Sequence, residues 1–281
     1  MPATIAILSR GKAHRTSAVV GQLFDMQLRA LRRDRAARSG AELFLLERAF
    51  ADCLERLALV DRRFERGLLI GCPDAGWLAR LRDFRMQVDV RDPGALFAER
   101  ADGEIIVEDD WTAAADTYDF VLAVGTLDTV NDLSRALKSI ARSMRPASLF
   151  LGALSGGDTL PQLRSAMRAA DLATGIASPH IHPRIEASAV APLLAQAGFD
   201  MPVVDVDRAQ VSYQSIDRLI ADLRRMGGTN ILSGRSRRAL PREAREAARR
   251  CFAAAGDGQR TVETFEILHF AAWTPTSIPL R

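Results

Sequence analysis

The stretch Gly67-Leu68-Leu69-Ile70-Gly71-Cys72-Pro73-Asp74-Ala75-Gly76 decides how this chain is interpreted. A short apolar run ends on a glycine, which is typical of a buried strand that leads into a turn. The residues that follow, 77–84, have the pattern of a helix. The stretch therefore predicts a strand, a glycine-containing turn and a helix in succession.

Similar apolar runs recur on both sides of helical patterns. We expect further strands at residues 86–90, 104–107, 118–124 and 148–154, and helices at residues 132–144, 160–174 and 188–197. Residues 203–211 and 264–273 are strand-like and could form an antiparallel edge, and residues 215–226 and 241–255 are helical. Alternating strands and helices predict an α/β fold with a doubly wound, mostly parallel sheet.

The beginning of the chain has a different pattern. We expect a flexible arm over residues 1–22 and a helical segment over residues 23–66, in which apolar residues recur every three or four positions between residues 41 and 59. The main domain should span residues 67–275, with helical insertions between 160–200 and 215–260. We interpret the arginine-rich helix near residues 29–38 as a solvated face, or as a surface that docks an acidic partner.

The composition narrows the possible functions. The chain has 281 residues, of which 48% are hydrophobic, and a net charge of only +3, so nothing indicates a nucleic-acid partner. Three widely spaced cysteines suggest neither a disulfide framework nor a zinc site. No apolar run approaches the ~18–20 residues of a membrane span, and no secretory signal is evident. A cytoplasmic location is expected, with peripheral association with a membrane left open.

Ligands of a doubly wound sheet bind beyond the carboxyl ends of its strands. Glycines there let the backbone approach a nucleoside, and an acid after the next strand can accept the hydrogen bonds of two ribose hydroxyls. The candidate nucleoside-binding residues are Gly71, Cys72, Asp74, Gly76, Asp89, Glu108, Asp109 and Gly125. The alternative is that Asp89 caps a turn and that Gly76 is a helix C-cap or a packing glycine.

A second set of candidates follows the strand expected at residues 148–154. Gly156, Gly157 and Thr159 could shape a substrate pocket, while Asp158 or Thr159 could cap the next helix. We favour Thr159 as the cap and Asp158 as the residue that faces the pocket. We place His180 over the same pocket, on a loop stiffened by prolines, and assign Asp158 and His180 as the catalytic pair. Tyr213 could supply a pocket hydroxyl or could belong to the core.

A metal site is not expected. His180 and His182 alternate, but carboxylate or cysteine ligands at a suitable spacing are missing nearby.

Several motifs resemble those of a known family. They are Gly156-Gly157-Asp158-Thr159-Leu160, Ser178-Pro179-His180-Ile181, Ala197-Gly198-Phe199 and Gln210-Val211-Ser212-Tyr213. With Asn230 and Val130-Asn131-Asp132-Leu133, they resemble the complex I assembly-factor branch of the class I methyltransferases. The resemblance extends over roughly residues 22–275. It is looser to the biotin-pathway enzyme that methylates a malonyl thioester.

The resemblance implies a seven-stranded Rossmann-like sheet and S-adenosyl-L-methionine as the cofactor. It also implies a protein substrate, an arginine of a complex I iron–sulfur subunit, which the branch is described as hydroxylating. The activity expected on this basis is methyl transfer to a protein side chain, or the hydroxylation of the branch. The alternative is an assembly chaperone that keeps the fold but has lost the cofactor and catalysis.

Three departures from the family pattern bear on that choice. The glycine loop usually reads Gly-Cys-Gly-x-Gly, but here Pro73 replaces the central glycine, which fixes φ and removes an N–H. The usual Leu-Pro-Phe of the adenine-side loop is missing, and Trp111 could stand in as an apolar lid. The His-Trp pair common after the fourth strand is replaced by Asp128-Thr129.

Overall fold

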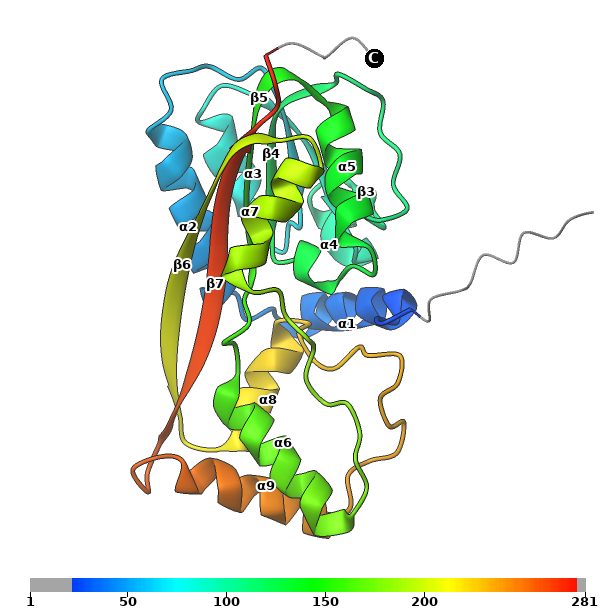
Figure 1. Ribbon diagram of the computed structural model, residues 1–281, viewed down its shortest axis with the longest axis vertical. Coiled ribbons are helices and arrows are strands. Elements are labelled where there is room, and N and C mark those ends of the chain that lie inside the picture. Colours follow the sequence, from blue (N-terminus) through cyan, green and yellow to red (C-terminus); the bar gives the residue numbers. More distant parts are fainter. Residues whose placement is uncertain (1–21, 277–281) are drawn as a thin grey trace, which may run out of the picture.

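The computed structural model describes residues 22–276, which form one seven-stranded sheet covered by helices (Figure 1). The strand order is β3-β2-β1-β4-β5-β7-β6, in which β7 alone runs antiparallel to its neighbours. The strands are β1 (Arg66–Ile70), β2 (Gln87–Asp92), β3 (Glu104–Ile105), β4 (Tyr118–Val124), β5 (Met144–Ser155), β6 (Asp200–Tyr213) and β7 (Thr261–Trp273). The expected doubly wound, mostly parallel sheet is confirmed.

Two of the helices precede β1, and the others connect the strands. They are α1 (Met26–Ser39), α2 (Phe44–Ala58), α3 (Gly76–Arg82), α4 (Ala95–Arg100), α5 (Leu133–Ser143), α6 (Pro161–Thr174), α7 (Ala187–Gln196), α8 (Ile216–Arg225) and α9 (Arg242–Ala254), with a 3₁₀ turn η1 (Leu127–Thr129) after β4. None of the helices in residues 22–276 is long and apolar enough to cross a membrane.

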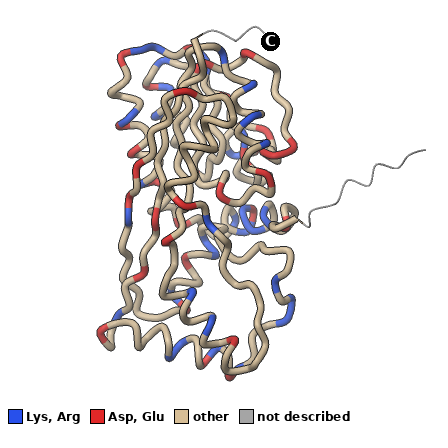
Figure 2. Tube along the Cα trace, viewed as in Figure 1, with Lys and Arg blue, Asp and Glu red and all other residues tan. Residues whose placement is uncertain are grey.

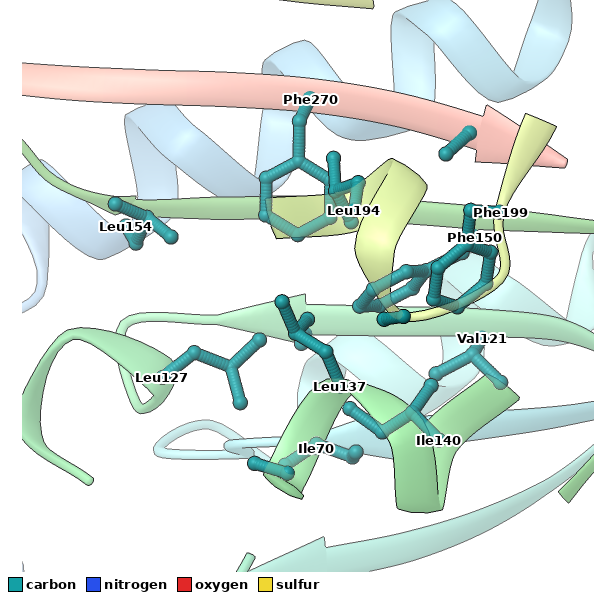
Figure 3. Close-up of a cluster of buried hydrophobic side chains, with 14 of the residues drawn as sticks. Ile70, Val121, Leu127, Leu137, Ile140, Phe150, Leu154, Leu194, Phe199 and Phe270 are labelled. Carbon is teal, nitrogen blue, oxygen red and sulfur yellow. The ribbon is translucent and has the colours of Figure 1, made fainter. Parts of the chain in front are cut away.

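The central strands form where the sequence is apolar without interruption. All seven residues of β4 are buried, because helices cover both faces of the sheet. One face packs against α5 and α7 around Phe150, Phe199 and Phe270, as Figure 3 shows. The other face packs against α2 and α3, where the rings of Phe50 and Trp77 stack 4.1 Å apart.

A third core lies beyond the end of the parallel strands. The long antiparallel pair β6 and β7 extends past the sheet, and α6, α8 and α9 pack against that extension around Leu219 and Phe252 (Figure 1). Helix α1 lies between this lower layer and the sheet. The carboxyl ends of the parallel strands are therefore covered by α1 and by the third core.

Most predicted elements are present, with ends that differ by up to three residues, and three further differences are larger or bear on the site. Strand β2 was expected to end near residue 90 but continues to Asp92, since Arg91 still pairs with both Ile70 and Glu104. Strand β5 begins at Met144 instead of residue 148. The short helix α4 was not predicted at all. The arm expected over residues 1–22 lies, except for its last residue, outside the described residues, and the domain division stays a prediction.

Candidate functional site

The loop after β1 is held by contacts between its own residues and by its close approach to β4. Gly71 has φ +87°, and a Cβ there would lie 2.4 Å from the carbonyl oxygen of Val124, so only glycine fits. The Asp74 carboxylate accepts a hydrogen bond from the Gly76 amide at 2.8 Å, and the Cys72 thiol donates to the Asp74 carbonyl. Burial raises the pKa of Cys72 to about 12, which leaves that thiol protonated at neutral pH.

The acid that ends β2 is Asp92, not Asp89. Its carboxylate is fully buried and accepts a hydrogen bond from the Cys72 amide at 2.8 Å, directly beside the glycine loop. It also accepts one from the Gly94 amide at 2.7 Å. Asp92 therefore holds the position at which a doubly wound sheet presents an acid to a ribose.

The position expected for Asp89 is wrong. Its carboxylate lies in the middle of β2, where it pairs with Arg66 at 3.0 Å and accepts a hydrogen bond from the Tyr118 hydroxyl. Because Arg66 and Tyr118 begin their strands, Asp89 faces away from the carboxyl ends. It lines a separate polar cavity with Trp111, whose ring lies 5.3 Å from the Arg91 guanidinium, so Trp111 does not cover the glycine loop.

The two acids after β3 have different partners. Glu108 is buried and forms a bidentate pair with Arg29 of α1, with N···O distances of 2.7 and 2.8 Å. Asp109 accepts hydrogen bonds from the amides of Asn131 and Asp132, and thereby fixes the loop before α5. Asp109 thus holds the backbone, whereas Glu108 pairs with α1.

A cavity of about 140 Å³ lies beside α1, at the carboxyl ends of β4 and β5. Its walls are mainly apolar and include Gly125 and Phe265. The charged side chains that line it are those of Arg33, Asp128, Arg184 and Glu266. Asp128 forms an ion pair with Arg184. Pockets for small ligands usually measure ~300–1,000 Å³, so this cavity has the size for a side chain and not for a nucleoside.

The loop after β5 borders this cavity through Thr159. The Thr159 hydroxyl donates to the Glu266 carbonyl and accepts from the Glu266 amide, both at 3.1 Å, so it joins the loop to β7. The predicted capping role is wrong, because the N-cap of α6 is Leu160, which makes no side-chain hydrogen bond to the helix. Asp158 is exposed and pairs with Arg208 at 3.2 Å.

The two glycines of this loop are required by close approach. A Cβ on Gly156 would lie 2.4 Å from the Glu266 carboxylate, and one on Gly157 would lie 2.3 Å from the Glu186 carboxylate. Both glycines therefore allow glutamates to come close to the backbone beside the cavity.

Two other predicted residues lie elsewhere. His180 borders an adjacent cavity of about 190 Å³, and its Nε2 lies 2.8 Å from the Asp171 carboxylate. Tyr213 belongs to the third core with Leu219 and Phe252, where burial raises the pKa of its hydroxyl. The structure therefore does not bring Asp158, His180 and Tyr213 together in one pocket. Across the described residues, no cluster of three or more metal-binding side chains occurs.

The residues present do not fit S-adenosyl-L-methionine in this conformation. The oxygens of Asp92 and Glu108 that would accept hydrogen bonds from a nucleoside are bonded to Arg33 and Arg29 of α1. The cavity that remains is smaller than such a ligand requires. Binding of the cofactor at the glycine loop, in another conformation, stays a prediction.

The site residues predicted from the sequence did not include Asp92, Glu266, Arg29 or Arg33. Asp92 could have been found from the turn that follows the strand, because Asp92-Pro93-Gly94 is a stronger turn signal than the residues after Asp89. Glu266 lies within a strand-like run, and no local pattern marks it. The two arginines look like any others on a basic helix.

Comparison with known proteins agrees with this architecture. Residues 43–205 match a family described as a methyltransferase domain. A proposed methyltransferase from Bacillus halodurans superposes with a TM-score of 0.56 over 81% of this chain and 99% of its own, at 11% identity. At that identity the likeness concerns the fold alone.

Curated relatives give a finer assignment. The mouse protein named arginine-hydroxylase NDUFAF5 is 30% identical over 92% of this chain and 79% of its own length. The malonyl-[acyl-carrier protein] O-methyltransferase of Laribacter hongkongensis is 30% identical, over 59% of this chain and 58% of that enzyme. The chain therefore belongs to the class I methyltransferase-like proteins, in the branch that contains the arginine-hydroxylase NDUFAF5.

Proposed function

We propose that this chain acts in the assembly of a respiratory NADH dehydrogenase by binding an arginine of one of its subunits in the 140 Å³ cavity. The observation that carries the proposal is the buried carboxylate of Glu266 in the wall of a cavity with the size of a side chain. The NDUFAF5 relatives are named for an activity on arginine, which supports the same substrate class. We expect the site of action to be the cytoplasm, at the membrane-bound complex.

An arginine already binds to this carboxylate from outside. The guanidinium of Arg208 lies 3.0 Å from the Glu266 carboxylate and 3.2 Å from that of Asp158. The Arg208 side chain is 58% exposed, so water can replace it at little cost. An incoming arginine would take over Glu266, since a planar guanidinium pairs with two carboxylate oxygens.

The surroundings hold Glu266 in place for this role. Thr159 fixes its backbone through two hydrogen bonds, and Gly156 leaves room for its side chain. The other charged side chains of the lining are already paired, since Arg184 neutralises Asp128 and Arg33 pairs with Asp92. Glu266 is therefore the carboxylate with the weaker hold on its present partner, and we assign guanidinium binding to it.

Methyl transfer from S-adenosyl-L-methionine to that arginine is a second candidate. The methyltransferase domain family and the strand order favour it. The conformation with α1 docked does not fit the cofactor, so this structure gives stronger support to binding than to catalysis.

The test is a binding titration with peptides that cover the arginines of the organism's own NADH dehydrogenase iron–sulfur subunits. Glu266→Gln should weaken binding of the recognised peptide about 10- to 100-fold, because one charge-assisted pair, worth about 1.5–3 kcal/mol, is lost. Replacing the peptide's arginine with citrulline should weaken binding to the same extent. Arg208→Ala should tighten binding, because it removes the competing guanidinium.

The matched control is Glu263→Gln, which changes another buried glutamate of β7. Its carboxylate accepts hydrogen bonds from the Gln162 and Leu163 amides and does not line the cavity. The control should lose stability while its folded form still binds the peptide. Equal binding by the wild type and Glu266→Gln would contradict the assignment of Glu266.

A further inference from the structure

Helix α1 docks on the sheet through arginines. Its buried side chains are Arg29, Arg33, Ala36 and Ala37, with no large apolar residue among them. Figure 1 shows α1 lying across the molecule below α4 and α5, and Figure 2 shows its run of basic residues. The helix is therefore held largely by what its two buried arginines bind.

Both arginines pair with acids at the carboxyl ends of the parallel strands. Arg33 forms a bidentate pair with Asp92, with N···O distances of 2.8 and 2.5 Å, and its guanidinium lies over the Phe97 ring. Arg29 pairs with both oxygens of Glu108 and donates to the Thr126 carbonyl at 2.7 Å. Burial opposes the charge of Arg33, but the charges of Asp92 and Glu108 outweigh it and raise its pKa.

These pairs use the groups on which a nucleoside would depend. Each oxygen of Asp92 accepts one hydrogen bond from Arg33 and one from a backbone amide, of Gly94 or Cys72. Both oxygens of Glu108 are bonded to Arg29. Ribose hydroxyls and an adenine amine are neutral donors, and their hydrogen bonds to a carboxylate are weaker than those of an arginine. Docked α1 therefore occupies the acceptors that a nucleoside would use.

We propose that α1 is a built-in occupant of the nucleoside site, and that an adenosine-type ligand binds only when Arg29 and Arg33 leave Glu108 and Asp92. Docked α1 and bound nucleoside are then mutually exclusive states of the same chain. The proposal rests on the pairs at Asp92 and Glu108 and not on Glu266. Arg33 also lines the cavity beside Glu266, but nucleoside binding and arginine binding are measured with different ligands, so either proposal can fail alone.

The experiment compares three full-length proteins by titration calorimetry with S-adenosyl-L-methionine and with S-adenosylhomocysteine. The double variant Arg29→Met, Arg33→Met removes both pairs. The control Arg35→Met, Arg38→Met removes the same charge from exposed positions of the same helix. We expect the first variant to bind at least tenfold tighter than the wild type, and the control to match the wild type. Hydrogen exchange of the α1 amides should accelerate at least tenfold in the first variant alone.

Two results would overturn the proposal. If the wild type binds as tightly as the double variant while its α1 amides stay protected, helix and nucleoside coexist. If neither protein binds although α1 is released, the Pro73 loop excludes the ligand and α1 does not. Should the double methionine variant fail to fold, Arg29→Lys with Arg33→Lys keeps the charges but loses the bidentate geometry. That variant should then show the same change in binding and exchange, to a smaller extent, and no change at all would count against the proposal.

Discussion

Replacing Thr159 with valine tests how the cavity wall is built. The two side chains have nearly the same shape, and Thr159 is almost fully buried. Its hydroxyl accepts the hydrogen bond of the Glu266 amide at 3.1 Å. The Glu266 carbonyl keeps a second donor, the Gly156 amide at 2.9 Å, so valine leaves one buried N–H without an acceptor. An unsatisfied buried donor costs about 1–3 kcal/mol, and we expect the free energy of unfolding to fall by that amount.

Urea denaturation followed by circular dichroism measures this change, and thermal unfolding should show a fall of about 2–4 °C per kcal/mol. Thr174→Val is the matched control. The Thr174 hydroxyl donates, at 3.3 and 3.4 Å, only to carbonyls of its own helix, so its loss should cost little. If Thr159→Val and Thr174→Val unfold at the same urea concentration, the hydroxyl of Thr159 does not hold β7, and the account of the wall is wrong.

Two further predictions concern buried charge. Asp92→Asn should lower the free energy of unfolding by about 3–5 kcal/mol, because it leaves the buried guanidinium of Arg33 unpaired. Asp89→Asn, at an exposed ion pair, should change the free energy of unfolding by at most ~1 kcal/mol. Similar values for the two variants in urea titrations would contradict the burial of the Arg33 pair. Burial lowers the pKa of His182 from 6.5 to about 3, so its contribution to stability is complete above pH 6.5 and is lost as the pH falls toward 3, with a slope of up to about 1.4 kcal/mol per pH unit. His182→Gln should reduce the dependence of the free energy of unfolding on pH between pH 7 and 4. Part of that dependence should remain, because burial also lowers the pKa of His269. An unchanged pH dependence would show that His182 protonates freely in the folded state.

The sequence by itself determined the fold class. Strands such as β4 carry seven consecutive residues that end up buried, and only a sheet covered on both faces accommodates such runs. The glycine that follows β1 also had a local meaning, since its left-handed backbone has room for no side chain. Patterns of this kind depend on hydropathy and backbone sterics within a few residues, which the sequence displays directly.

Hydropathy alone did not locate the end of β2. The apolar pattern stops at Val90, but Arg91 and Asp92 continue the strand because backbone hydrogen bonds to β1 and β3 hold them. Pairing between strands therefore fixes the position of the acid, and in the sequence only the turn signal Asp92-Pro93-Gly94 marks it.

Only the tertiary structure decided what the arginines of α1 do. In the sequence, Arg29 and Arg33 belong to a basic helix whose expected place is in water. Their carboxylate partners lie 79 and 59 residues further along the chain, and no local pattern links them. A charged side chain is buried where the fold places an opposite charge beside it, because the attraction between the two offsets the cost of removing both from water. That condition is set by the fold as a whole, which is why the occupant of the nucleoside site became visible only in three dimensions.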